Sequence, residues 1–279
     1  MAIKLDLVGK KSDPVAFHYT WKDAVLYALG VGAKAAELDY LYENRGPRVL
    51  PTFAVVPSFN SMISVAGDLG ANPMMILHGE QKIVLHRPIP PSGTLTTVSE
   101  VKAIYDKGKG AVVVVEAKTA GEDKEPVFDN VFSIFVRGEG GFGGERGPEA
   151  QKLEPPAGKA PDFEIVETTS PEQALLYRLS GDINPLHADP AMAKFGGFDR
   201  PILHGLCTYG FAGRAIIKGA LGGDEKKLKS FGARFAGVVF PGDTLTTRGW
   251  KNEGGSYLIT VSTQDGRQVL SNAVAEVHP

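Results

Sequence analysis

An internal repeat constrains the fold of this chain more than any other feature of its sequence. When the 279 residues are laid on themselves with a shift of 150, identical residues fall in one ungapped register across three separate segments. A register that holds over such a length indicates a duplicated domain. The matching pairs are Ala24 and Ala174, Leu26 and Leu176, Tyr27 and Tyr177, Leu29 and Leu179, Pro51 and Pro201, Pro91 and Pro241, and the runs 94–97 and 244–247.

A segment rich in glycine and proline separates the two copies. It begins Gly-Glu-Gly-Gly-Phe-Gly-Gly-Glu-Arg-Gly-Pro at residue 138 and continues with charged residues and further prolines. Such a composition cannot sustain a helix or a central strand. We therefore predict an N-terminal unit at 1–137, a linker at 138–160 and a C-terminal unit at 161–279.

The same order of elements is predicted in each unit. A first helix has Thr20 or Ser170 as its N-cap, with Pro171 in the first turn. A second helix follows Pro201 and is apolar nearly all round, which is typical of a buried helix. Strands rich in Val, Ile, Thr and Tyr then follow one another. This order predicts an α+β fold, with an antiparallel sheet wrapped round one helix, made twice. The predicted strands are 81–85, 95–105, 111–119, 127–137, 230–240, 244–250, 257–263 and 269–277.

The bulk composition excludes several classes of protein. The formal net charge is −2 and no basic run occurs, so we expect no binding to nucleic acid or to a membrane surface. No secretory signal and no apolar run of membrane-spanning length is present. The one cysteine, Cys207, is predicted to be a small buried residue, and a single thiol favours a reducing compartment such as the cytoplasm. The C-terminus is not a peroxisomal Ser-Lys-Leu signal.

The segment from Tyr177 to Thr208 carries the chemistry. Asp182, Asn184 and His187 stand within six positions, on irregular backbone after a helix that we expect to end near Leu179 or Ser180, with Gly181 as its cap. Asn184 precedes a proline and should be extended. Asx turns at helix ends are ordinary, but a histidine adds a group that titrates near neutrality and can act as acid or base. Asp189 is predicted only to cap the turn that follows.

Gly205 stands where the buried helix of the C-terminal unit begins. The first N–H groups of a helix are unpaired and lie at the positive end of its dipole. A glycine there would let a substrate oxygen approach the backbone, as in an oxyanion hole. A contact between helix and sheet is the alternative reason for this glycine. We interpret the neighbouring His204 as a packed or capping residue rather than a catalyst.

The repeat provides an internal control. At a shift of 150, Asp182 corresponds to Gly32, Asn184 to Lys34, His187 to Glu37 and Gly205 to Val55. Positions that bear the fold are kept in both copies, whereas the candidate chemical residues occur in one. We infer one active unit and one degenerate unit.

The motif Tyr-Arg-Leu-Ser-Gly-Asp-Ile-Asn-Pro-Leu-His-Ala-Asp-Pro at 177–190, continued by Gly197-Phe198 and by Pro-Ile-Leu-His-Gly-Leu-Cys-Thr at 201–208, resembles hydratase 2. This is the (3R)-specific 2-enoyl-CoA hydratase of the MaoC-like group, part of peroxisomal multifunctional enzyme type 2 in some eukaryotes. The resemblance covers the whole chain. It implies a double hot-dog fold, a homodimer and an acyl-CoA substrate, with no separate cofactor because coenzyme A is part of the substrate. It also implies a peroxisomal location if the chain belongs to such a eukaryotic enzyme.

The resemblance also implies roles for the site residues. Asp182 and His187 would be the catalytic pair, Asn184 would help to hold the water, and the Gly205 N–H would bind the thioester oxygen. The degenerate unit would widen the acyl tunnel. The alternatives are a dehydratase acting on a carrier-protein thioester, and a non-catalytic acyl-thioester binding module or thioesterase.

Three other interpretations are set aside. Residues 138–143 fit Gly-x-Gly-x-x-Gly, but prolines follow where a dinucleotide-binding fold needs a helix. Asp182, His187 and Asp189 could ligate a metal, but we expect none because no second histidine or cysteine is predicted nearby. We expect no serine hydrolase, because no Gly-x-Ser-x-Gly sequence occurs.

Overall fold

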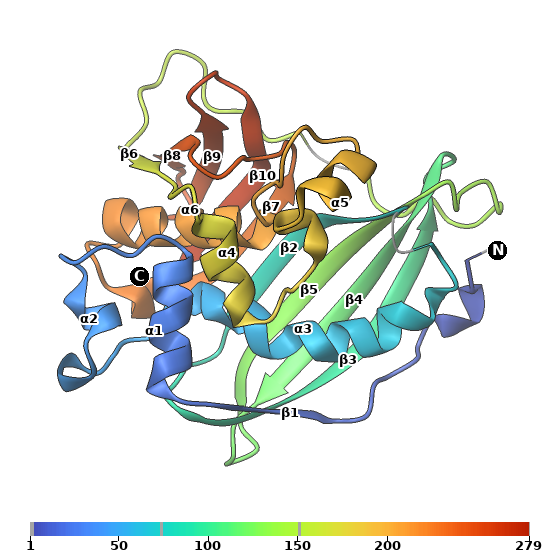
Figure 1. Ribbon diagram of the computed structural model, residues 1–279, viewed down its shortest axis with the longest axis horizontal. Coiled ribbons are helices and arrows are strands. Elements are labelled where there is room, and N and C mark those ends of the chain that lie inside the picture. The colour runs from blue at the N-terminus through green and yellow to red at the C-terminus, as the bar shows by residue number, and fades with distance from the viewer. Residues whose placement is uncertain (1–2, 73–74, 150–151, 279) are drawn as a thin grey trace.

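A single antiparallel sheet of ten strands forms the framework of the protein (Figure 1). The computed structural model describes residues 3–72, 75–149 and 152–278. The strands lie in the order β1-β3-β4-β5-β2-β7-β10-β9-β8-β6. Their bounds are Val15–Tyr19 (β1), Ile76–Leu85 (β2), Gly93–Asp106 (β3), Gly110–Ala120 (β4), Pro126–Arg137 (β5), Phe163–Thr168 (β6), Leu228–Phe235 (β7), Thr244–Lys251 (β8), Tyr257–Thr263 (β9) and Gln268–Val277 (β10).

The strand order is the same from either edge to the centre. Counted inward from β1, the sheet holds the first, third, fourth, fifth and second strands of the N-terminal half. Counted inward from β6, it holds the strands of the C-terminal half in the same order. The halves join where β2 pairs with β7, with Ile83 opposite Phe231. The predicted α+β double hot-dog fold is confirmed, since each half wraps five strands round a helix. The exact unit boundaries stay a prediction.

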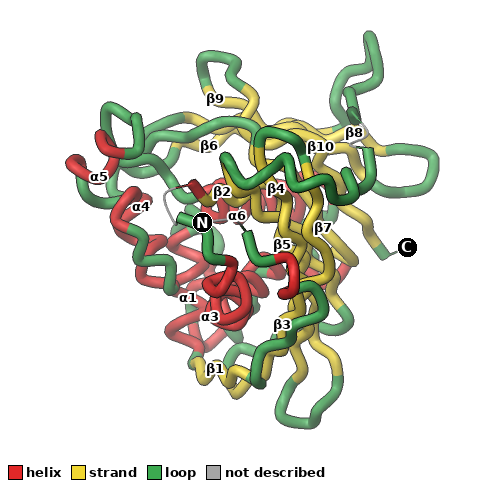
Figure 2. Tube along the Cα trace, turned by 90° about the vertical axis from the view of Figure 1, so that its right-hand side faces the viewer, coloured by secondary structure: helices red, strands yellow, loops and turns green. Residues whose placement is uncertain are grey.

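The helices lie on one face of the sheet (Figure 2). The two central helices are α3 (Val55–Ala66) and α6 (Gly205–Ala220). Smaller helices flank them: α1 (Trp21–Gly30), α2 (Leu38–Leu41), α4 (Gln173–Tyr177) and α5 (Pro190–Phe195), together with short 3-10 turns such as η3 (Pro51–Ala54), η6 (Arg178–Ser180) and η7 (Pro185–His187). Among the described residues, no helix has the length and apolar character needed to cross a membrane.

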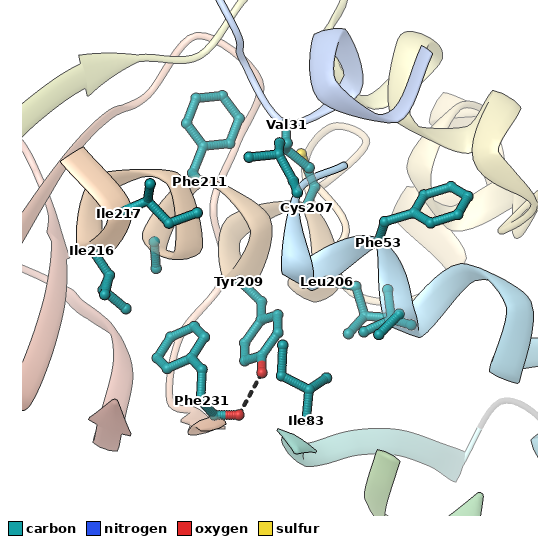
Figure 3. Packing of buried hydrophobic residues seen from close by; sticks show 14 of the residues in the cluster. Val31, Phe53, Ile83, Leu206, Cys207, Tyr209, Phe211, Ile216, Ile217 and Phe231 are labelled. Atoms are coloured by element: carbon teal, nitrogen blue, oxygen red, sulfur yellow. Dashed lines mark hydrogen bonds between the residues drawn. The ribbon is translucent and has the colours of Figure 1, made fainter. Parts of the chain in front are cut away.

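The helix α6 is buried as predicted, and its residues make much of the core (Figure 3). The Tyr209 ring stacks on Phe231, and its hydroxyl donates to the Phe231 carbonyl at 2.6 Å. Cys207 is fully buried, which confirms that expectation. The glycines of α6 allow the N-terminal half to come close, because a Cβ on Gly210 would lie 2.3 Å from the Val31 side chain.

Several predicted element bounds need correction. Thr20 caps α1 in a capping box with Asp23, as predicted, but α4 begins only at Gln173, so Ser170 and Pro171 lie in the turn before it. The strand predicted at 230–240 spans 228–235, and past its end the Val239 carbonyl accepts from the Leu203 N–H, which belongs to no strand. The edge strands β1 and β6 were not predicted.

The glycine-rich start of the linker is organised by one carboxylate. Asp106, at the end of β3, accepts hydrogen bonds from the N–H groups of Gly108, Gly141 and Gly143, each at 2.8 Å. These bonds, that of Gly141 first, lower the pKa of Asp106. The amides that would cradle a dinucleotide phosphate are thus already occupied, which supports setting that interpretation aside.

Candidate active site

The loop after α4 and η6 holds Asp182 and Asn184. The chain reverses at Gly181, whose φ of +126° is a conformation that L side chains rarely adopt. Asn184 is extended as predicted, and its N–H donates to Asp182 Oδ1 at 3.2 Å. Its own Oδ1 accepts from the Leu186 N–H at 3.0 Å and caps η7. The side chain of Asn184 is exposed, and its role in holding water stays a prediction.

His187 lies at the end of η7 and is 9% exposed. Its Nδ1 is 2.9 Å from the Ile202 carbonyl, which can only accept, so Nδ1 carries the hydrogen and Nε2 presents a lone pair. Burial lowers the pKa of His187, against the opposing effects of the Ile202 carbonyl and Asp182. The side chain is therefore a neutral base at neutral pH.

The structure brings Asp182 and His187 together, and adds His204. One carboxylate oxygen and one nitrogen from each ring all lie within 4.8 Å of one another. The His187 and His204 rings are stacked, with 3.7 Å between centroids. Asp189 is not part of this cluster: its Oδ1 accepts from the Ala191 N–H and caps α5, as predicted.

Gly205 is the first residue of α6 and is exposed, although the helix behind it is buried. The His204 carbonyl accepts from the N–H groups of Cys207 and Thr208, whereas the Gly205 N–H has no acceptor among the described residues. A Cβ at this position would lie 3.0 Å from the Phe235 ring. The predicted close approach of helix and sheet is therefore present, whereas the oxyanion role of the open N–H stays a prediction.

The corresponding positions of the N-terminal half form no such site. The Val55 N–H, which corresponds to that of Gly205, bonds to the carbonyls of Thr52 and Phe53. The Phe211 ring occupies the space beside Gly32, where a Cβ would meet it at 2.3 Å. The N-terminus of the central helix in this half is thus closed by η3, and the inference that this half is degenerate stays a prediction.

A cleft of about 870 Å³ lies apart from the site residues, over the other face of the sheet, because Val112 and Val114 in its lining alternate with core residues that pack on α3. Residues of β2, β4, β5, β7 and the linker line it, with apolar side chains such as Val112, Val131 and Phe135. This volume is in the range of small-molecule sites.

Comparison with known proteins decides the family. The model of the MFE-2 hydratase 2 N-terminal domain matches residues 17–138, and that of the MaoC-like domain matches residues 152–272. A probable enoyl-CoA hydratase 2 from Dictyostelium discoideum is 40% identical over 281 residues, covering 98% of this chain and 96% of that protein. The chain belongs to the hydratase 2 family of MaoC-like proteins.

Two further proteins are similar to the chain over most of its length. A peroxisomal enoyl-CoA hydratase 2 from Arabidopsis thaliana is 40% identical over 264 residues, covering 88% of this chain and 85% of that protein. The crystal structure of a MaoC-like dehydratase from Phytophthora capsici superposes with a TM-score of 0.89 at 34% identity, covering 99% of this chain and 98% of that one. Since relatives include peroxisomal enzymes, the cytoplasmic location stays a prediction.

The expectation that no second histidine lies near Asp182 and His187 was wrong, because His204 lies beside both. An ion bound by two imidazoles must lie in the plane of both rings. The His187 and His204 planes are only 29° apart and are stacked face to face, so in this arrangement their lone pairs do not converge.

Sequence reasoning missed the contacts of two residues. His204 was interpreted as a packed or capping histidine, and its contacts with both Asp182 and His187 were not foreseen. Arg214, in the middle of α6, bonds to Glu37 and Glu167 and is 4% exposed. A lone charge in an apolar helix was the available signal for that ion pair.

Proposed function

We propose that this chain hydrates trans-2-enoyl-CoA to (3R)-3-hydroxyacyl-CoA. The observation that carries the proposal is the meeting of Asp182 and His187 beside the start of a buried helix whose first N–H is open. The family membership supports an acyl-thioester substrate, and the R configuration follows the hydratase 2 resemblance.

The geometry supports a role for each residue. The thioester oxygen accepts a hydrogen bond from the Gly205 N–H, which draws electrons from C3 of the conjugated acyl group. Water held by Asp182, Asn184 and His187 then forms a bond from its oxygen to C3. Its proton passes to the Asp182–His187 couple, a proton from the couple is delivered to C2, and the double bond is lost. The balance is one water added and an unchanged enzyme.

No separate cofactor is required by this reaction, because water and the conjugated thioester are its reactants.

The test is an assay on crotonyl-CoA. We expect the enoyl-thioester absorbance to fall with no release of free thiol, and chiral analysis to show the (3R) product. Release of thiol would establish a thioesterase instead, and binding without turnover a binding module. Either result would contradict the proposal.

A dehydratase on a carrier-protein thioester is the second candidate, favoured by the likeness to the Phytophthora MaoC-like dehydratase. Hydration and dehydration share one transition state, so the same residues would serve. Rates on 3-hydroxybutyryl-CoA and on the same acyl group attached to a carrier protein separate the two. We expect the coenzyme A thioester to be turned over faster.

We also propose that the chain forms a homodimer, as the resemblance implies. Large apolar side chains near the site are exposed, Ile183 to 71% and Phe195 to 74%. Light scattering with size-exclusion chromatography should give twice the chain mass of 29.7 kDa. A mass of one chain at micromolar concentration would contradict this.

A further inference from the structure

His204 contacts both members of the proposed couple. Its ring stacks on that of His187, and its Nε2 lies 3.1 Å from the Asp182 backbone carbonyl. The residue directly precedes α6, and its own carbonyl accepts the first hydrogen bonds of that helix. The buried helix α6 therefore fixes the backbone of His204, while Asp182 lies on an irregular loop. His204 is thus the link between a rigid element and a loop.

The hydrogen bond to Asp182 fixes the tautomer of His204. A carbonyl only accepts, so Nε2 carries the hydrogen and Nδ1 has a lone pair. That Nδ1 is buried and has no hydrogen-bond partner within residues 3–72, 75–149 and 152–278. A buried acceptor without a partner destabilises a fold. A phenylalanine would fill the same space without that penalty, so packing alone does not account for a histidine here.

The His204 ring packs against two other rings. The Tyr177 ring is tilted by 51° with 4.9 Å between centroids, and the His187 ring is stacked with 3.7 Å between centroids. Burial lowers the pKa of His204 to about 3, so the ring stays neutral at working pH. A neutral ring against His187 leaves that residue free to accept a proton without repulsion from a second charge.

We propose that His204 is a positioning residue, whose ring sets the plane of His187 while its N–H anchors the loop that carries Asp182. The inference rests on the proposed function. In this proposal His204 does not contact the reacting atoms, and it acts only through His187 and Asp182.

Two variants separate the contacts. His204→Phe keeps a flat ring against His187 and removes the donor to Asp182, whereas His204→Gln keeps a donor nitrogen and removes the ring. We expect kcat on crotonyl-CoA to fall by about 10- to 100-fold in each, as for a small misplacement of catalytic groups. KM should stay within about twofold, because the residue does not touch substrate in this account. His204→Phe should unfold at the same temperature as the wild type or higher.

A second readout does not depend on activity. The groups that face His187 are Asp182, Arg178, His204 and the Ile202 carbonyl. With His204→Gln, water reaches the open face of the His187 ring, so its pKa should rise toward the usual value in an NMR titration. With His204→Phe the face stays covered and the pKa should not change.

A failure of the positioning role can be told apart from a failure of the proposed hydratase function. If the wild type hydrates crotonyl-CoA and both variants keep a kcat within twofold of it, only the positioning role is overturned. If the wild type shows no hydratase activity, the proposed function fails, and the NMR titration still decides whether His204 controls the surroundings of His187. An unchanged titration in His204→Gln then overturns the inference.

Discussion

Arg214 from α6 forms an ion pair with Glu37, the residue that corresponds in the N-terminal half to His187 in the C-terminal half. The same guanidinium reaches Glu167 at 3.1 Å and the Val31 carbonyl at 3.1 Å. Where the C-terminal half has the proposed catalytic histidine, the N-terminal half thus has a carboxylate that binds the central helix of the C-terminal half. In the N-terminal half this position makes a contact between the halves.

This contact predicts a large effect on stability. Arg214→Ala should lower the free energy of unfolding by about 3–5 kcal/mol, because the side chain is 2% exposed and its loss leaves two carboxylates without their partner. Urea unfolding followed by circular dichroism measures this. The matched control is Arg248→Ala, which breaks an exposed pair with Glu164 and should cost less than about 1 kcal/mol. Equal effects of the two variants would contradict the account.

A second prediction concerns acid sensitivity. In the unfolded chain His204 takes up a proton near its usual pKa of 6.5, but in the fold it does so only at about 3. Between these values the unfolded state binds more protons, so this group makes the fold less stable as pH falls. The slope for one proton is about 1.4 kcal/mol per pH unit.

Replacing His204 should remove its contribution to the pH dependence of the unfolding free energy. Unfolding free energies of His204→Phe and wild type, measured from pH 7 to pH 4, should diverge as pH falls, with the variant gaining relative stability. Parallel curves would show that His204 titrates equally in both states.

The oxyanion role of Gly205 predicts a difference between two substitutions. Proline is tolerated at the first position of a helix, and His204 before it is already extended, with ψ of 135°. Gly205→Pro therefore removes the N–H with little change of backbone. Gly205→Ala keeps the N–H and introduces a Cβ contact with Phe235 in the same place.

The difference between Gly205→Pro and Gly205→Ala measures the contribution of the N–H donor. We expect kcat of Gly205→Pro to lie below that of Gly205→Ala by about 10²- to 10³-fold, the cost of one oxyanion donor. Initial rates on crotonyl-CoA measure it. If the two variants turn over equally, the N–H does not bind the thioester oxygen.

The sequence predicts the parts of this fold that depend on local pattern. The repeat, the buried helix and most strands follow from composition and periodicity. The edge strands β1 and β6 alternate in burial as strands do, but with five and six residues the alternation is too short to stand out in the sequence. β7 ends at Phe235, and beyond it the Val239 carbonyl bonds to the distant Leu203 N–H instead of to a neighbouring strand. Residues of strand-forming type therefore continue past the real strand.

The site shows the same limit. Asp182, Asn184, His187 and Gly205 are recognisable because they stand close together in one motif. His204 lies 22 positions after Asp182, and only the folded path of the loop brings its ring against His187. Because stacking and tautomer depend on tertiary structure, the sequence indicates a buried histidine and not its contacts. The pairing of Arg214 with Glu37 is hidden for the same reason.

The central claim is that Asp182 and His187 act as one acid–base couple on an enoyl thioester. The most direct measurement is kcat on crotonyl-CoA for Asp182→Ala and His187→Ala, beside Asp189→Ala as a control that removes only the cap of α5. We predict losses of about 10²- to 10⁴-fold for the first two, with folded proteins, and a rate near wild type for the control. A rate near wild type for Asp182→Ala or for His187→Ala would contradict the account.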